Sequence, residues 1–307
     1  MGILGRGNAY PSGADGRPGR RGGIRWWIIL LFAGYAAWNW FGNQKIDPYT
    51  GSKAHYGAST EEEAQLGVQA FEQVLSQEHA LDADDPAAKQ IQDIAQRLVA
   101  RASAVEADLA AENQQPSPDL AKTFDWSVAV LQSDQANAFC LPGGKMAVYT
   151  GLIPVTQNAD AMAVVMGHEI AHALLRHGSQ RMAQQKLVQM GQMAAGVAVG
   201  DMDPQQQQMV MSALGAGAQY GLILPYGRNH ETQADEVGLM LAAAACYDPH
   251  AAIGLWQRMS QLNGGQRPPE FASTHPDPAN RIEHLQSLMP KAEQFYARYC
   301  GANAPSQ

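Results

Sequence analysis

The sequence predicts an α+β fold that is mostly α-helical, with a small β-sheet and one apolar helix ahead of the folded domain. Three observations support this prediction. Apolar residues recur at helical spacing over most of the chain, strand-like runs cluster between residues 124 and 149, and an uncharged apolar run follows a basic N-terminus. With 307 residues, of which 46% are hydrophobic, the chain can bury one sizeable core.

The N-terminus differs from the rest of the chain. Residues 1–25 are rich in glycine, carry five arginines and are expected to be disordered. Residues 26–42 form an apolar run with tryptophans at both ends, typical of a transmembrane signal-anchor, although the run is at the short limit for a bilayer span. The arginines before it predict a cytoplasmic N-terminus. A cleaved signal peptide is the alternative, because residues 34–36 form a passable cleavage site.

After the apolar run, residues 43–58 are expected to form a polar linker. The folded domain is expected over residues 59–300, with a loose tail at 301–307. Two packing helices are expected to open the domain, one from Thr60 and one over residues 84–111, because each has an apolar stripe at helical spacing. We assign no chemistry to either helix.

Three strands are expected next, at residues 124–131, 138–141 and 145–149. The turn Pro142-Gly143-Gly144 has the composition that joins two strands into a hairpin. The sequence therefore predicts a small sheet directly ahead of the most informative motif in the chain.

That motif is His168-Glu169-Ile170-Ala171-His172. On a helix, His168 and His172 are one turn apart on the same face, so both imidazoles can bind one metal ion. Glu169 follows the first of them, where its carboxylate can take a proton from metal-bound water. Residues 161–176 are almost wholly apolar, and polar groups in a buried helix need partners. The motif is a zinc-peptidase signature; two histidines that merely hydrogen-bond in the core are the alternative.

A third ligand is expected downstream, because catalytic zinc takes three protein ligands and keeps one position open for water. Glu231 and Asp235 are four residues apart and share a helix face. Glu231 is the candidate ligand, and Asp235 is expected to hydrogen-bond a ligand imidazole and fix its orientation. His230 is a rival ligand, but it points about 100° away from Glu231 on a helix.

With these residues in hand, the chain resembles the membrane-associated gluzincin metallopeptidases, the family of the CAAX prenyl endopeptidases and of the HtpX, BepA and LoiP proteases. The resemblance spans roughly residues 58–290 and is closest to the periplasmic BepA and LoiP type. Its four landmarks occur in the family's order, at residues 137–144, 168–172, 228–238 and 275–282. The resemblance implies one Zn²⁺ per chain, bound by His168, His172 and Glu231, with Glu169 as the catalytic base. Gly227 and Cys140 depart from the common family residues, and neither departure removes a catalytic group.

The resemblance also implies a function. It implies a membrane-anchored zinc endopeptidase that hydrolyses peptide bonds of misfolded or misassembled envelope proteins, as part of protein quality control. We expect a single-pass protein of the bacterial inner membrane with a periplasmic catalytic domain, or a periplasmic protein after signal cleavage. Two other functions stay open: a non-catalytic, zinc-stabilised chaperone or assembly factor, and a processing peptidase with one dedicated substrate.

The expected partners are protein or peptide substrates and, through the N-terminal helix, the membrane. A peptide can add to the edge of the small sheet in extended form, since main-chain hydrogen bonds bind it with little regard to its sequence. The net charge of −8 argues against nucleic-acid binding. No glycine-rich phosphate loop or nucleotide fingerprint occurs in the sequence, so no nucleotide is expected.

Three features have no settled role at this stage. Residues 179–226 form an insertion that is either a lid over the cleft or a packed helical hairpin. His275 can fill zinc's open position and hold the enzyme latent, hydrogen-bond the developing oxyanion, or order its loop against Arg281. Of the three cysteines, Cys246 and Cys300 are predicted to form a disulfide, and Cys140 to be a small buried residue.

Overall fold

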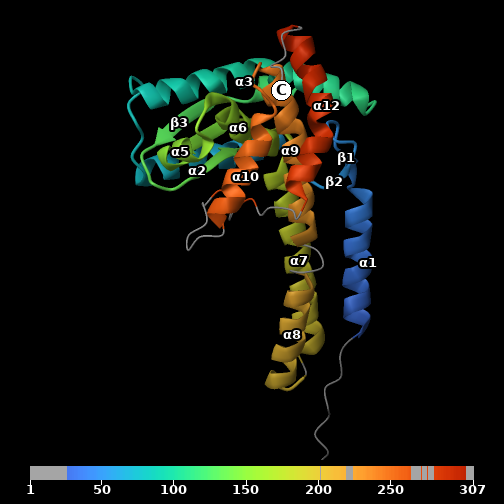
Figure 1. Cartoon of the computed structure of the whole chain (residues 1–307). Coiled ribbons are helices and arrows are strands. Elements are labelled where there is room, and N and C mark those ends of the chain that lie inside the picture. Colours follow the sequence, from blue (N-terminus) through green and yellow to red (C-terminus); the bar gives the residue numbers. More distant parts are fainter. Residues whose placement is uncertain are drawn as a thin grey trace, which may run out of the picture.

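A helical body with a small sheet carries a projection in which three helices run away from it together (Figure 1). The computed structural model describes residues 26–200, 202–218, 224–263, 271, 275 and 280–301. The expected disorder of residues 1–25 and the greater part of the expected loose tail fall outside the described residues. The three projecting helices are α1 (Trp26–Gly42), α7 (His177–Val199) and α8 (Pro204–Ala218).

Helix α1 covers the same residues as the expected apolar helix. Within the described ranges, no helix has both the length and the apolarity that crossing a bilayer demands. After α1, the expected polar linker contains a short antiparallel hairpin of β1 (Lys45–Ile46) and β2 (Lys53–Ala54). The hairpin forms because the Asp47 carboxylate accepts the backbone N–H groups of Tyr49 and Thr50 and so closes the turn.

The two packing helices are α2 (Thr60–Gln77) and α3 (Pro86–Glu112). A capping box starts α2: the Ser59 hydroxyl accepts the N–H of Glu62, whose carboxylate accepts the N–H of Ser59. Asp85 caps α3 through the N–H groups of Ala87 and Ala88. Both helices therefore begin within two residues of their expected starts.

The sheet has three strands, β3 (Ser127–Leu131), β4 (Ala138–Leu141) and β5 (Lys145–Tyr149), in the order β3-β5-β4. β4 and β5 form the expected antiparallel hairpin, whereas β3 runs parallel to β5. The first strand begins at Ser127 and not at the predicted residue 124. The short helix α4 (Leu120–Thr123) precedes it, and Phe124 donates its N–H to Leu120 at the end of that helix.

Two central helices, α6 (Ala159–Leu174) and α9 (Leu224–Ala244), carry the candidate site residues. They touch backbone to backbone where two glycines meet. A Cβ added at Gly167 would lie 2.7 Å from the Gly238 carbonyl oxygen, and one at Gly238 would lie 2.6 Å from the backbone nitrogen of His168. No larger residue fits at either position. The short helices η1 (Thr150–Leu152) and α5 (Ile153–Thr156) lead from β5 to α6, which Asn158 caps through the N–H of Ala161.

Helix α6 ends before the pair His177-Gly178, although a glycine just past an apolar helix is a typical C-terminal signal. The break comes at Arg176, which takes a left-handed φ of 55°, and α7 begins at His177. Arg176 is held there because its guanidinium donates to the Glu63 carboxylate and to the Ala58 carbonyl oxygen. Gly178 therefore lies inside α7, where helix continues through it.

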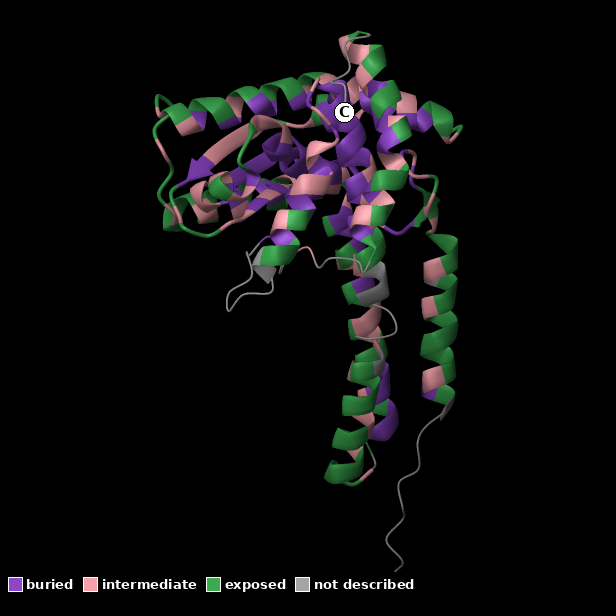
Figure 2. Ribbon diagram, viewed as in Figure 1, coloured by how far each residue is buried: buried purple, intermediate pink, exposed green. Residues whose placement is uncertain are grey.

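The insertion between the metal-motif helix and α9 is a helical hairpin of α7 and α8, followed by a stretch outside the described residues. It runs away from the body beside α1 and does not fold across the body as a lid would (Figure 1). Figure 2 shows exposed residues along both α1 and α8. This arrangement favours the packed hairpin over the lid.

At the C-terminal side, α10 (Ala251–Asn263) and α12 (Arg281–Cys300) pack on the central helices. The predicted disulfide is confirmed: Cys246, two residues beyond α9, is bonded to Cys300, with the two Cα atoms 5.6 Å apart. Cys140 is the free cysteine and is buried, also as predicted.

The glycine contact between α6 and α9 generates a stability prediction. Gly167→Ala should lower the free energy of unfolding by about 1–3 kcal/mol, because its methyl group overpacks the crossing. Gly196→Ala in α7 is the matched control, since a Cβ there meets nothing within 4 Å and alanine favours a helix. Thermal unfolding of both purified variants decides the matter. Equal midpoints in the two variants would contradict the close approach.

Candidate active site

Four side chains from three parts of the fold meet in one cluster. His168 and His172 come from α6, Glu231 comes from α9, and His275 comes from the segment between α10 and α12. One ligand atom from each lies within 4.8 Å of the others. The three ligands implied by the family resemblance are thus brought together, with His275 as a fourth donor.

The spacing of these atoms fits zinc. Ligand atoms that bind zinc tetrahedrally at about 2.0–2.1 Å lie about 3.3 Å from one another. The Nε2 atoms of His168 and His172 are 3.0 Å apart, and the Glu231 carboxylate oxygens lie 3.3 Å and 3.5 Å from them. Nδ1 of His275 lies 3.0 Å from Glu231 and 3.3 Å from His168. Imidazole nitrogen and carboxylate oxygen are also the donor types that zinc prefers.

The charges in the cluster favour a cation. Burial opposes the charged form of His168, yet its hydrogen bonds with Asp235 and Glu231 raise its pKa to about 9. Burial also opposes ionisation of Glu231, but hydrogen bonds from His168 and His275 hold the pKa of this carboxyl far below its usual range. Burial and the neighbouring His168 lower the pKa of His172, which is therefore neutral. The negative charges of Glu231 and Asp235 thus favour a bound cation beside the imidazoles.

Glu169 lies beside the cluster with one carboxylate oxygen unpartnered. Oε1 is buried and has no hydrogen-bond partner among the described residues, and the backbone N–H of Cys140 lies close enough to the carboxylate to lower its pKa slightly. Nε2 of His275 is 3.4 Å from this oxygen. Burial raises the pKa of Glu169, with the charge on His275 opposing the shift. A carboxylate with a raised pKa and a free oxygen is suited to proton transfer.

Asp235 holds the ring of His168 from behind. The Nδ1–H group of His168 donates to the Asp235 carboxylate at 2.9 Å, which leaves Nε2 facing the cluster. Arg281 donates to the same carboxylate at 2.6 Å, and its guanidinium lies 3.4 Å from the centre of the Trp256 ring. Burial would raise the pKa of Asp235, but the charge of Arg281 outweighs it and keeps the group anionic.

His177 contacts His172, the other histidine of the metal motif, an interaction that the sequence analysis does not predict. Its Nδ1 lies 2.8 Å from Nδ1 of His172, and its Nε2 lies 3.1 Å from the amide oxygen of Gln233. The Gln233 amide nitrogen donates to Ser52, so the amide oxygen is the atom that faces His177. His177 therefore donates from Nε2 and accepts from His172, whose Nε2 is left free for a metal.

His230, the rival ligand, lies outside the cluster. It is buried, stacks on His177 with ring centres 4.1 Å apart, and hydrogen-bonds the Gln180 side chain. Its ring thus supports the orienting histidine and does not join the four donors.

An edge strand passes the cluster. β4 is at the edge of the sheet, and Tyr149 of β5 donates its N–H to Asn137. In an antiparallel ladder, peptide groups point toward the partner strand and away from it in alternation. Because Asn137 is bonded to β5, the register of β4 and β5 directs the peptide groups of Ala138 and Cys140 away from β5. The N–H of Cys140 is on this outward side and contributes to the pKa of Glu169. The outward side of β4 therefore begins beside the candidate base.

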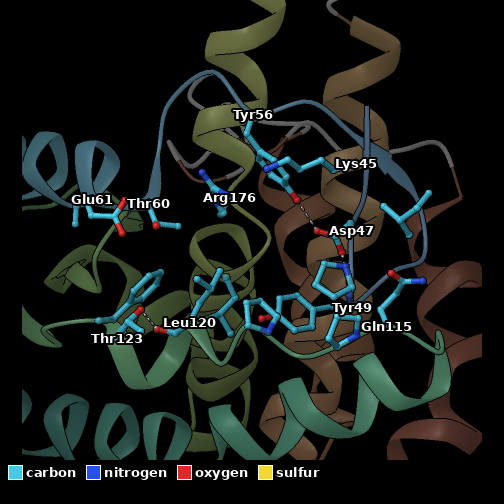
Figure 3. A pocket seen from close by; sticks show the side chains of 17 residues that line it. Lys45, Asp47, Tyr49, Tyr56, Thr60, Glu61, Gln115, Leu120, Thr123 and Arg176 are labelled. Atoms are coloured by element: carbon cyan, nitrogen blue, oxygen red, sulfur yellow. Dashed lines mark hydrogen bonds between the residues drawn. The ribbon is translucent and has the colours of Figure 1, made fainter. Parts of the chain in front are cut away.

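A separate hollow of about 560 Å³ lies past the C-terminal end of α6. Tyr49, Leu174 and Arg176 line it, and the Tyr56 hydroxyl donates to Asp47 across it (Figure 3). Its lining includes none of the four cluster residues. The hollow and the cluster are therefore distinct sites.

Comparison with known proteins gives a consistent result. Residues 96–289 match peptidase family M48. The mitochondrial metalloendopeptidase OMA1 of Schizosaccharomyces pombe is 36% identical over 169 residues, which is 55% of this chain and 48% of the relative. Human OMA1 is 35% identical over 177 residues, 55% of this chain and 33% of its own. The beta-barrel assembly-enhancing protease of Escherichia coli is 26% identical over 180 residues, 54% and 37% respectively.

The chain spans half or less of the length of these relatives. The family match nevertheless covers well over half of the chain and contains every residue of the cluster, together with Glu169, Asp235 and Arg281. It confirms the expected resemblance and the expected zinc cofactor. The chain therefore belongs to peptidase family M48, a family of zinc metallopeptidases.

Proposed function

We propose that this protein is a zinc endopeptidase whose metal is bound by His168, His172 and Glu231. The observation that carries the proposal is the near-tetrahedral spacing of their ligand atoms, 3.0–3.5 Å apart. Bound zinc would polarise the scissile carbonyl and acidify a water molecule. Asp235 and His177 act on the protein side by fixing the two imidazoles with Nε2 toward the metal.

Glu169 is the proposed catalytic base. Its free, buried oxygen takes the proton of the attacking water and then passes it to the leaving amine. A buried carboxylate oxygen that accepts no hydrogen bond is unfavourable in a purely structural metal site, so its presence supports an enzyme over a zinc-stabilised chaperone.

The substrate is proposed to bind as an extended polypeptide along β4. The carbonyl groups of Ala138 and Cys140 point outward, where main-chain N–H groups of a substrate can pair with them, as expected for an edge strand, whereas the Ala138 N–H group already donates to the Asn137 side chain. This mode selects for an unfolded segment and depends little on sequence. It therefore supports misfolded or misassembled envelope proteins as substrates, in preference to one dedicated substrate.

We propose membrane attachment through α1, with the catalytic domain on the periplasmic side. Large apolar side chains of α1, among them Trp27, Leu30 and Trp38, are more than 60% exposed. Such exposure is expected for a helix that lies in lipid. Removal of α1 by signal cleavage is the alternative.

We further propose that His275 is a latch on the metal site. Its Nδ1 lies among the ligand atoms, where it would fill zinc's open position and exclude water. The alternative of a loop ordered against Arg281 has less support, because Arg281 binds Asp235. Oxyanion assistance requires a ring that has left the cluster.

The role of Glu169 can be tested directly. Glu169→Gln should keep zinc near one equivalent and lower casein cleavage by roughly 10²- to 10⁴-fold, because the base is lost and the ligands remain. His172→Ala, as the control, should lose zinc and activity together. Cleavage by Glu169→Gln at the native rate would exclude the mechanism.

The positioning role of Asp235 separates it from the neighbouring His230. Asp235→Ala should weaken zinc binding by roughly 10- to 100-fold, because His168 loses the partner of its Nδ1–H group. His230→Ala should keep zinc, because that ring is outside the cluster. Competition with a chelator of known affinity measures both. Zinc loss in His230→Ala alone would overturn the ligand assignment.

The latch predicts a gain of function. His275→Ala should raise basal proteolysis, including self-cleavage, by a factor that reports the fraction of molecules held closed. Zinc content should stay near one equivalent, since three ligands remain. A fall in turnover with zinc retained would instead indicate oxyanion assistance, and unchanged turnover would leave only a structural role.

A further inference from the structure

The base of the projection contains a polar hollow of about 600 Å³ between the end of α1 and the start of α7. Three basic residues line it: Lys45, Arg176 and Lys186. No aspartate or glutamate is among its described lining residues. Both its size and its mixed lining are within the range of small-molecule sites in proteins.

Two of these positive charges are uncompensated. Arg176 is paired with Glu63, whereas neither Lys45 nor Lys186 forms an ion pair within the described part of the chain. Lys186 donates to the Gly57 carbonyl oxygen at 2.6 Å, which turns its ammonium group toward the hollow's rim. The charge of Lys186 helps to lower the pKa of Glu62, but the Glu62 carboxylate accepts the Ser59 N–H group in the capping box and forms no ion pair with Lys186. The hollow therefore offers an anionic group two lysines that have no acidic partner in an ion pair among the described residues.

An apolar groove of about 480 Å³ continues from this hollow along the projection. Residues of α1, α7 and α8 line it, and Gln192 is the one polar side chain among the described residues of its wall. The groove and the hollow share Ala36, Leu187 and Met190, so they form one continuous site with a basic end and an apolar end.

The outside of the projection is apolar as well. Residues 26–44, 187–200 and 204–218 contain no charged side chain. Met193 and Val197 on α7 and Met209 on α8 are more than half exposed. So are six large apolar or aromatic residues of α1: Trp27, Leu30, Leu31, Tyr35, Trp38 and Phe41. Water is a poor solvent for such a surface, and lipid is a good one.

The hollow lies where a lipid headgroup would be. Trp40 stacks on His55 at 3.6 Å, and the His55 Nε2–H group donates to the Trp40 carbonyl oxygen, which fastens the end of α1 to the body. Aromatic rings at the end of an apolar helix are typical of the membrane interface. Lys45, Tyr56, Thr60 and Arg176, which Figure 3 shows around the neighbouring hollow, also line this one.

We propose that this continuous site binds one anionic phospholipid of the surrounding membrane. Its phosphate lies against Lys45 and Lys186, and an acyl chain lies in the groove between α1, α7 and α8. The bound lipid would complete the contact between α1 and the α7–α8 hairpin. The inference rests on the membrane attachment proposed above, but not on peptidase activity.

Native mass spectrometry of the full-length protein, extracted in detergent and mixed with phosphatidylglycerol or phosphatidylcholine, tests the basic end. We expect one retained phosphatidylglycerol and little phosphatidylcholine. Each lysine near an anionic lipid strengthens binding by roughly fivefold, so Lys45→Ala/Lys186→Ala should weaken retention by roughly 25-fold. Lys53→Ala/Lys122→Ala is the matched control, since both lysines are exposed and outside the hollow. Equal retention in the two double variants would overturn the proposal.

The apolar end is tested with two glycines of α7 at which an added Cβ meets nothing within 4 Å. Gly191 lines the groove and Gly196 does not. Gly191→Leu should fill the groove and displace the lipid, whereas Gly196→Leu should retain it. Displacement by glycerol 3-phosphate at the same concentration as the lipid would show that only a free phosphate group is recognised, and would also overturn the proposal.

An alkaline wash of membranes tests attachment through α1 separately from lipid binding. Release of the wild-type protein from membranes by an alkaline wash would refute attachment through α1. Selective retention of phosphatidylglycerol by the released protein would still support the site. Loss of casein cleavage in any of these variants would be a separate matter, because none of the substituted residues belongs to the metal cluster.

Discussion

The backbone contact between Gly167 and Gly238 is the constraint on which the rest of the site depends. It sets α6 and α9 closer than two side-chain-bearing helices can lie, and His168 and Glu231 are carried by these two helices. With the two helices in this contact, the carboxylate oxygens of Glu231 lie 3.3 Å and 3.5 Å from the Nε2 atoms of His168 and His172. The close packing of the two glycines thus helps to set the distance between Glu231 and the two imidazoles.

Each of the two histidines that we propose as ligands has its own orienting partner, and the two partners differ in charge. Asp235, held anionic by Arg281, supports His168, whereas the neutral His177 supports His172. The anionic partner makes one imidazole more basic, and the neutral partner fixes the ring without adding charge. The cluster is therefore asymmetric, with its negative charge concentrated on the α9 side.

The metal motif and the i, i+4 pair on α9 could be predicted from the sequence because helical spacing alone places such residues on one face. The β4–β5 hairpin also follows from local composition, and the disulfide follows from the oxidising compartment that the sequence analysis expects. His177 could not be predicted in this way, because its role depends on a chain break at Arg176 that a distant glutamate, Glu63, stabilises. The only signal was a histidine five residues after His172. The direction of the α7–α8 hairpin was equally hidden, since it depends on contacts with α1.

The disulfide between Cys246 and Cys300 closes a covalent ring around the segment that contains His275 and Arg281. The two cysteines are 54 positions apart. In the chain-entropy model, a ring of this size lowers the conformational entropy of the unfolded chain and so stabilises the fold by about 4 kcal/mol. The ring also changes what a single cut can do. If the protein cleaves itself within this segment, α12 stays tethered to α9 and Arg281 stays near Asp235. The two fragments of a nicked molecule would stay covalently linked, with Arg281 still beside Asp235, until the disulfide is reduced.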